Sequence, residues 1–237
     1  MSDAFVLVHG STGGAGHWLQ IAPVLADRYQ VLTPEYGQRD EGPMEVDGLV
    51  AEVLAAVDEA GVDTFHLAGW SLGAVLSAAI AAEVPDRVRT LTLANGWARS
   101  DARMRFTFDL WARLLRADTD LFARYAFADG LTAGAFEAFG EGVESLLPMM
   151  AAGLSPGSAW HAELDGRIDI EDRLGAIDAP TLVVGGIDDR WVDIRHSHHL
   201  AAAITDARLE ELECGHLVPT EKGPELTALL LEHAEGR

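Results

Sequence analysis

The stretch Phe65-His66-Leu67-Ala68-Gly69-Trp70-Ser71-Leu72-Gly73-Ala74 decides how the rest of the chain is organised. Its first four residues form a short apolar run typical of a buried strand, and the Ala-rich segment that follows, up to Glu83, is typical of a helix. Between the two lies Gly-x-Ser-x-Gly, whose glycines remove the Cβ atoms that would clash in a tight turn. The pattern predicts a strained turn that exposes the Ser71 hydroxyl at the carboxyl end of the strand, beside the free N–H groups of a helix.

The composition indicates a globular chain. A length of 237 residues suits a single α/β domain, residues 1–237, and a hydrophobic content of 49% excludes a disordered chain. No apolar run approaches the roughly 20 residues of a membrane span. The first ten residues lack the basic start of a signal peptide. The lone cysteine, Cys214, excludes an internal disulfide and is typical of a reducing compartment, so we expect a cytoplasmic protein.

The net charge of the chain indicates which kinds of partner it can bind. Lys and Arg number 17 against 38 Asp and Glu, which gives a formal net charge of −21 spread along the chain. Nucleic acid and anionic membranes are themselves negative, so we expect the chain to bind neither. The expected partner is a small-molecule substrate, and the expected state is a monomer or a homodimer.

Apolar runs that favour strands alternate with segments of helical periodicity over most of the chain. The expected strands cover residues 4–8, 29–33, 65–68, 88–94, 179–186 and 208–212, with helices between them that include 17–27 and 46–59. This alternation predicts an α/β fold, with a mostly parallel sheet of about six strands and helices on both faces. From about residue 97 to 172 there is no strand-like run, and we expect a small helical cap over the carboxyl edge of the sheet.

A glycine-rich stretch, Gly10-Ser11-Thr12-Gly13-Gly14-Ala15-Gly16, follows the first expected strand. One interpretation is the phosphate-binding turn of a dinucleotide site, with Glu35 after the second strand holding a ribose. The other is a loop that donates a backbone N–H to an oxyanion. We favour the second, because the glycine spacing is irregular and because a reacting Ser71 needs an oxyanion donor from this loop.

A second set of residues suits nucleophilic catalysis. A serine hydroxyl becomes a nucleophile when a base takes its proton, and the base needs a third group to hold its tautomer. The chain offers these groups in the order Ser71, then Asp188 or Asp189 after a strand, then His216 in a loop after the last strand. This order predicts a catalytic triad of Ser71, His216 and one of the two aspartates.

At this point the chain resembles the α/β-hydrolase superfamily over essentially its whole length. In many members the strand before the acid reads Pro-x-x-x-x-x-Gly-x-x-Asp, followed by two residues and Val. Pro180, Gly186, Asp189 and Val192 match that spacing. The resemblance therefore favours Asp189 over Asp188 as the triad acid.

The resemblance also implies the fold and the oxyanion hole. It implies an α/β-hydrolase fold in which the backbone N–H groups of Ser11 and Leu72 stabilise the oxyanion. One departure is that many members begin with an antiparallel hairpin before the His-Gly strand, for which this chain has no room. We therefore expect a trimmed sheet.

The start of the cap carries a narrower likeness. Asn95-Gly96-Trp97, with arginines and aromatics after it, is similar to the cap entrance of aminoacrylate hydrolase-like proteins and of 3-oxoadipate enol-lactone hydrolases. Trp70 inside the turn, and Trp97 and Phe106 in the cap, are expected to line the substrate pocket.

The expected reaction is hydrolysis of an ester or lactone of a small organic molecule through an acyl-enzyme. It requires no metal or organic cofactor. The neighbouring His196, His198 and His199 lack a carboxylate or cysteine at a recognised metal spacing, so no metal site is expected. The alternatives are hydrolysis of a C–C, amide, thioester or enamine-type bond on the same fold, or a non-catalytic small-molecule binder.

Overall fold

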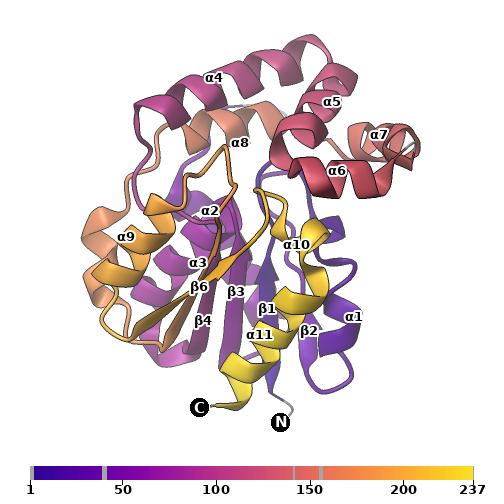
Figure 1. The fold of residues 1–237 in the computed structure, drawn as a ribbon. Coiled ribbons are helices and arrows are strands. Elements are labelled where there is room, and N and C mark those ends of the chain that lie inside the picture. Colours follow the sequence, from indigo (N-terminus) through magenta and orange to yellow (C-terminus); the bar gives the residue numbers. More distant parts are fainter. Residues whose placement is uncertain (1–2, 39–41, 141, 155–156, 237) are drawn as a thin grey trace.

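One parallel sheet organises the structure. The computed structural model describes residues 3–38, 42–140, 142–154 and 157–236 (Figure 1). Within them six strands form a sheet in the order β2-β1-β3-β4-β5-β6, and every neighbouring pair is parallel. The strands are β1 (Ala4–Val8), β2 (Gln30–Leu32), β3 (Phe65–Trp70), β4 (Val88–Ala94), β5 (Thr181–Gly186) and β6 (Ala207–Leu212). The predicted α/β fold is confirmed.

The central strands are buried on both faces. Every residue of β1, β3 and β5 is buried, which explains why these segments are continuous apolar runs rather than alternating ones. Val6 lies opposite Leu67, and Leu67 lies opposite Leu91, so that apolar residues stand side by side across the sheet. Because all the strands run the same way, their carboxyl ends meet at one edge, and the loops that leave β1, β3, β5 and β6 gather there.

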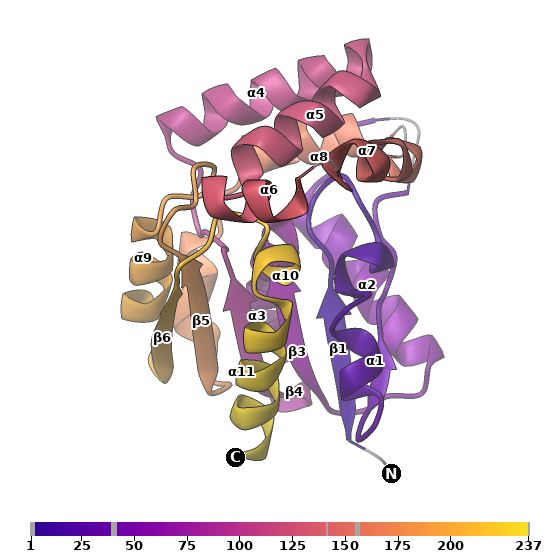
Figure 2. The same ribbon diagram turned by 45° about the vertical axis from the view of Figure 1, so that its right-hand side comes forward.

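Helices cover both faces of the sheet. α1 (Ala22–Leu25) and α11 (Gly223–Glu235) lie on one face, whereas α2 (Val46–Glu59), α3 (Leu72–Glu83) and α9 (Arg195–Ala203) lie on the other (Figure 1, Figure 2). α3 is almost wholly buried, because its many alanines allow close packing on β3 and β4. Short helices complete the elements: η1 (Ala15–Trp18), η2 (Pro85–Arg87), η3 (Glu171–Ala176) and α10 (Val218–Glu221).

One expected helix differs from the structure. The helix predicted over residues 17–27 is replaced by the 3-10 helix η1 and the four-residue α1. Pro23 lies in the first turn of α1, where its missing N–H and fixed φ suit a helix start rather than a helix interior. The chain therefore turns between Leu19 and Ile21 and begins a new helix.

In the described ranges between β4 and β5, five α-helices lie over the carboxyl edge of the sheet (Figure 1, Figure 2). They are α4 (Ala102–Ala117), α5 (Thr119–Gly130), α6 (Ala133–Phe139), α7 (Gly142–Gly153) and α8 (Ser158–Asp165), and are called the cap below. The side chains of Asp101, Asp118 and Thr132 each accept a hydrogen bond from the backbone N–H three residues further on, which sets the starts of α4, α5 and α6. No helix in the described ranges is long and apolar enough to cross a bilayer.

Candidate active site

Ser71 occupies the sharp turn between β3 and α3. Its φ of 57° and ψ of −125° place a non-glycine residue in a strained conformation. The turn is tight enough that a Cβ on Gly69 would lie 2.1 Å from the carbonyl oxygen of Gly73, and a Cβ on Gly73 would lie 2.1 Å from that of Val8. Glycine is therefore required on both sides of Ser71, as the Gly-x-Ser-x-Gly pattern predicts.

His216 and Asp189 extend a chain of hydrogen bonds from Ser71. The Nε2 atom of His216 lies 2.9 Å from Oγ of Ser71, and its Nδ1 atom lies 2.7 Å from Oδ2 of Asp189. All three side chains are buried. A carboxylate at Nδ1 holds the proton on that nitrogen and leaves Nε2 free to accept the serine proton.

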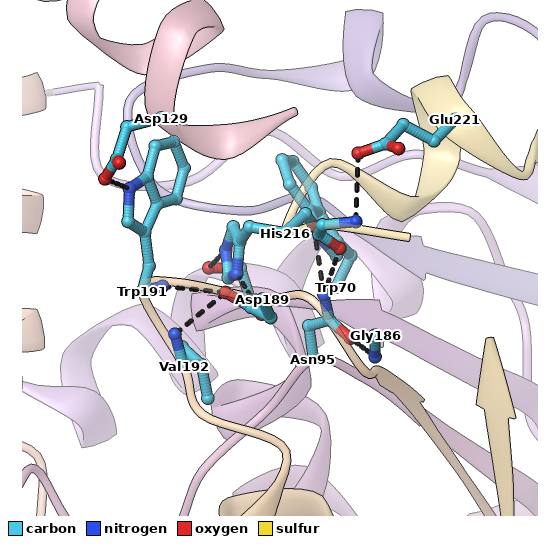
Figure 3. Close-up of polar contacts among 11 residues, drawn as sticks. Trp70, Asn95, Asp129, Gly186, Asp189, Trp191, Val192, His216 and Glu221 are labelled. Atoms are coloured by element: carbon cyan, nitrogen blue, oxygen red, sulfur yellow. Dashed lines mark hydrogen bonds and ion pairs between the residues drawn. The ribbon is translucent and has the colours of Figure 1, made fainter. Parts of the chain in front are cut away.

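The structure distinguishes the two neighbouring aspartates. The Oδ1 atom of Asp189 accepts hydrogen bonds from the backbone N–H groups of Trp191 and Val192, at 2.8 and 3.0 Å, which fix the carboxylate toward His216 (Figure 3). Asp188 is exposed to solvent. The carboxylate that bonds to His216 is therefore that of Asp189.

Asn95 ties the ends of three loops together. It follows β4 with a φ of 46°, and its Nδ2 donates to the carbonyl oxygens of Gly215 and His216, both at 3.1 Å. Its Oδ1 accepts from the backbone N–H of Gly186, and Trp70 Nε1 also donates to the His216 carbonyl at 2.8 Å (Figure 3). Asn95 thereby holds the backbone of His216. No motif in the sequence pointed to this role. The one hint in the sequence is the residue type: asparagine is polar, tolerates the left-handed backbone conformation, and here directly follows a buried strand.

The two amides expected to form the oxyanion hole border Ser71. Leu72 begins α3, so that its N–H has no acceptor within the helix. Gly10 packs directly on the turn, since a Cβ there would lie 3.2 Å from Cβ of Ser71, and Ser11 follows it. In the part of the chain that the structure describes, neither the Ser11 nor the Leu72 N–H donates a hydrogen bond to the protein. Both are therefore available to a ligand.

A cavity of about 850 Å³ opens between the cap and the sheet edge, with Ser71 and His216 among its lining residues. Most of the remaining wall is apolar and comes from the cap and from the loops after β5 and β6: Trp111, Phe122, Phe127, Leu146, Trp191 and Leu217. The glycine-rich loop, Glu35 and Gln38 also line the cavity. The site can therefore hold a small molecule with a large apolar part over Ser71.

Only one of the three residues expected to line the pocket does so. Trp70 lines the cavity. Trp97 is buried elsewhere, stacked on Phe108, and Phe106 is 77% exposed to solvent. The expectation for Trp97 and Phe106 is corrected, because α4 turns Phe108 and Trp111 inward and leaves Phe106 on the outer face. Helical spacing alone did not say which face would meet the cavity.

The glycine-rich loop lines the same cavity as Ser71. Glu35, the residue that a dinucleotide site would need for the ribose, accepts a hydrogen bond from the backbone N–H of Ala15 at 2.8 Å. The carboxylate therefore braces the loop.

The three neighbouring histidines of α9 contact three different carboxylates. His196 pairs with Asp101, His198 with Glu211 and His199 with Glu171. Within the described ranges no group of three or more metal-ligating side chains converges on one point. These histidines link α9 to neighbouring elements instead.

Known proteins are similar to this chain in sequence, and others are similar to it in fold. A family model described as the alpha/beta hydrolase family matches residues 5–228. Pyrrolizixenacetamide deacetylase of Xenorhabdus hominickii is 33% identical over 234 residues, which cover 95% of this chain and 88% of the relative. The 2-hydroxy-6-oxo-6-phenylhexa-2,4-dienoate hydrolase of Comamonas testosteroni is 30% identical over 261 residues, which cover 99% and 88%.

Solved structures agree on the fold. The crystal structure of the enol-lactonase from Burkholderia xenovorans superposes with a TM-score of 0.89 at 21% identity, and covers 99% of this chain and 92% of that one. Such an identity supports the architecture, whereas the family match and the closer relatives extend the likeness to the sequence. The chain therefore belongs to the alpha/beta hydrolase family of enzymes.

Proposed function

We propose that the chain is a serine hydrolase that cleaves an ester or lactone of a small organic molecule through an acyl-enzyme. The observation that carries the proposal is the unbroken line of hydrogen bonds from Ser71 through His216 to Asp189, beside an apolar cavity. The order and geometry of these groups match what a serine nucleophile needs.

In the proposed acylation, Ser71 Oγ attacks the substrate carbonyl carbon while Nε2 of His216 takes the serine proton. The carbonyl oxygen gains the negative charge and is stabilised by the N–H groups of Ser11 and Leu72. Asp189 stabilises the imidazolium that forms. His216 then gives the proton to the leaving alkoxide, and the C–O bond to the alcohol breaks.

Deacylation repeats these steps with water. His216 takes a proton from a water molecule, whose oxygen attacks the acyl carbon at Ser71. The Ser71 ester bond breaks, His216 returns the proton to Oγ, and the acid product leaves. Each proton moves between groups that this chain holds. We propose that residues 1–237 act as one catalytic unit in which the cap covers the bound substrate, and that the unit functions in the cytoplasm.

The cavity supports a substrate with a sizeable apolar group. Its volume of about 850 Å³ falls in the range of small-molecule sites, and several aromatic rings line it. An aryl or branched alkyl group would therefore lie under the cap with the scissile carbonyl at Ser71.

The first test is intact-mass spectrometry after treatment with a fluorophosphonate, which phosphonylates an activated serine and releases fluoride. One adduct is expected on the wild type and none on Ser71→Ala. A panel of aryl esters, lactones and anilides then ranks the bond types by kcat/KM. A folded protein that gains no adduct and hydrolyses no member of the panel would favour a non-catalytic binder.

Amide hydrolysis is the second candidate. It is supported by the 33% identity to the protein named pyrrolizixenacetamide deacetylase. Both candidates use the same Ser71 acyl-enzyme, and they differ in the leaving group that His216 must protonate. Comparison of an acetanilide with the matching phenyl acetate separates them, because a true amidase retains measurable kcat/KM on the anilide.

A further inference from the structure

The glycine-rich loop that carries Ser11 is held by a cap helix. Ser11 Oγ donates to Oδ2 of Asp165 at 2.6 Å, and the backbone N–H of Thr12 donates to Nδ1 of His161 at 3.3 Å. Both acceptors lie on α8, more than 140 residues along the chain, and the α8 residues are one helical turn apart. Two consecutive loop residues are therefore bonded to one face of one helix.

These bonds lie in the interior of the molecule. Asp165 is 0% exposed and His161 is 1% exposed, so neither bond competes with bulk water. Burial raises the pKa of Asp165 to about 8, against a smaller opposing effect of the Ser11 hydrogen bond, and burial lowers the pKa of His161 to about 3. Both side chains are thus largely uncharged near neutral pH. Neutral His161 can accept at Nδ1 because its proton then lies on Nε2.

The loop needs such support because its backbone is strained. Thr12 has a φ of 63°, in the left-handed region that branched residues rarely occupy. The loop is held on its other side by the Tyr36 hydroxyl, which donates to the carbonyl oxygen of His9. The His161 ring fits against Gly37, where a Cβ would lie 2.2 Å from Nε2. Strained conformations persist when the surrounding contacts leave no alternative, and here these contacts come from α8 of the cap and from Tyr36.

We propose that His161 and Asp165 are positioning residues that hold the Ser11–Thr12 backbone in the geometry of the oxyanion hole. Neither lines the cavity, so they act through the loop and not through the substrate. The cap then has a second task besides covering the substrate: it completes the site that stabilises the charged intermediate. This inference rests on the proposed function for its kinetic consequences, whereas its structural part can be measured without turnover.

The test uses paired substitutions in the full chain. Asp165→Asn keeps an oxygen acceptor for Ser11, and His161→Asn keeps an acceptor near the position of Nδ1, whereas Asp165→Leu and His161→Leu remove each acceptor. Glu163→Gln is the control on the same helix, because Glu163 pairs with Arg116 and does not contact the loop.

Amide hydrogen exchange over residues 10–16 is the first measurement. The two Leu variants are expected to exchange at least about 10-fold faster there than the wild type, and the Asn variants and Glu163→Gln within about twofold of it. Unchanged exchange in folded Leu variants would overturn the proposal. If the Leu variants do not fold, Ser11→Ala removes the Asp165 bond from the loop side without adding bulk, and the same increase is expected.

Turnover of an aryl ester is the second measurement. The Leu variants are expected to lose about 10- to 100-fold in kcat, with KM within about threefold, since a displaced donor weakens only the transition state. The Asn variants should retain most of the activity. Faster exchange without a fall in kcat overturns the role in the reaction. A wild type that hydrolyses nothing refutes the proposed function instead, and the exchange data still decide whether α8 holds the loop.

Discussion

The carboxyl edge of the sheet and the cap border the same cavity, and they are built from different contacts. At the sheet edge, Ser71, Asp189 and His216 are joined by hydrogen bonds of 2.7 to 2.9 Å. On the cap side of the cavity, Trp111 packs edge-on against Phe122 and Trp191. Hydrogen bonds are directional and hold the bonded atoms in place to within fractions of an ångström. Packed aromatic rings instead define the shape of the cavity wall.

The sheet edge and the cap are expected to tolerate different substitutions. At the sheet edge, a substitution that removes one hydrogen-bonding atom interrupts the line of hydrogen bonds from Ser71 through His216 to Asp189. Loss of one ring in the cap changes the fit of the substrate and leaves the reacting groups in place. The contacts of His161 and Asp165 with the glycine-rich loop are the exception, because they are hydrogen bonds between the cap and the loop that carries Ser11.

The largest effect is expected at the proposed nucleophile, Ser71, and the proposed base, His216. Ser71→Ala and His216→Ala should each lower kcat for an aryl ester by at least about 10⁴-fold, because neither proton transfer nor acyl-enzyme formation survives. The melting temperature should change by only a few degrees. Retained turnover in Ser71→Ala would show that another group attacks the substrate.

The acid pair offers an internal control. Asp189→Asn should lower kcat by about 10³- to 10⁴-fold, since an amide no longer holds the His216 tautomer. Asp188→Asn should stay within about threefold of the wild type, because that side chain is exposed. Steady-state kinetics on both variants checks this, and equal losses would contradict the assignment of Asp189.

Asn95 tests how much the sheet edge depends on loop positioning. Asn95→Gly suits the φ of 46° but removes three hydrogen bonds to the loops of Gly186 and His216. We expect a loss of about 2–4 kcal/mol in the free energy of unfolding and of about 10- to 100-fold in kcat. Urea denaturation and ester kinetics measure the two effects. A stable variant with full activity would show that Trp70 alone holds the His216 carbonyl.

Asp165 makes a pH-dependent prediction for the cap. Burial raises its pKa to about 8, whereas an unfolded chain titrates such a carboxyl near 4. The folded state therefore binds the proton more tightly, and the stability that this group supports falls as the pH rises from about 4 to about 8. Asp165 contributes at most about 1.4 kcal/mol per pH unit to the change of the free energy of unfolding with pH.

Asp165→Asn removes that titration. Urea denaturation at several pH values from 5 to 8.5 measures the free energy of unfolding of both proteins. As the pH rises, the free energy of unfolding of the variant should increase relative to that of the wild type. A constant difference between the two proteins across this range would contradict a raised pKa at Asp165.

The smallest effects are expected within α4. Trp111→Phe enlarges the cavity and should change kcat/KM a few-fold, with a shift toward bulkier acyl groups, because Trp111 lines the wall. Phe106→Ala should leave kcat/KM unchanged and alter stability by no more than about 0.5 kcal/mol, since Phe106 lies on the outer face. An ester series of increasing acyl size, measured on both variants, checks the distinction between the two faces.

The sheet and the sharp turn that carries Ser71 could be predicted from the sequence alone. Continuous apolar runs predicted the six strands, and the Gly-x-Ser-x-Gly turn placed Ser71 between β3 and α3, because these features depend on a few neighbouring residues. The acid strand could be assigned in the same way, from the spacing that ends at Asp189. Local backbone sterics and burial leave few alternatives at such places.

Which cap residues face the cavity, and which hold the loops, depends on how the helices pack in three dimensions. Phe106 and Trp111 are both aromatic residues of α4. Only the rotation of the helix about its axis determines that Trp111 lines the cavity whereas Phe106 is exposed to solvent. Asp165 meets Ser11 across 154 residues, through a packing of α8 that no local pattern encodes. Contacts of this kind depend on how whole elements dock, and docking is decided by the sum of many side-chain volumes.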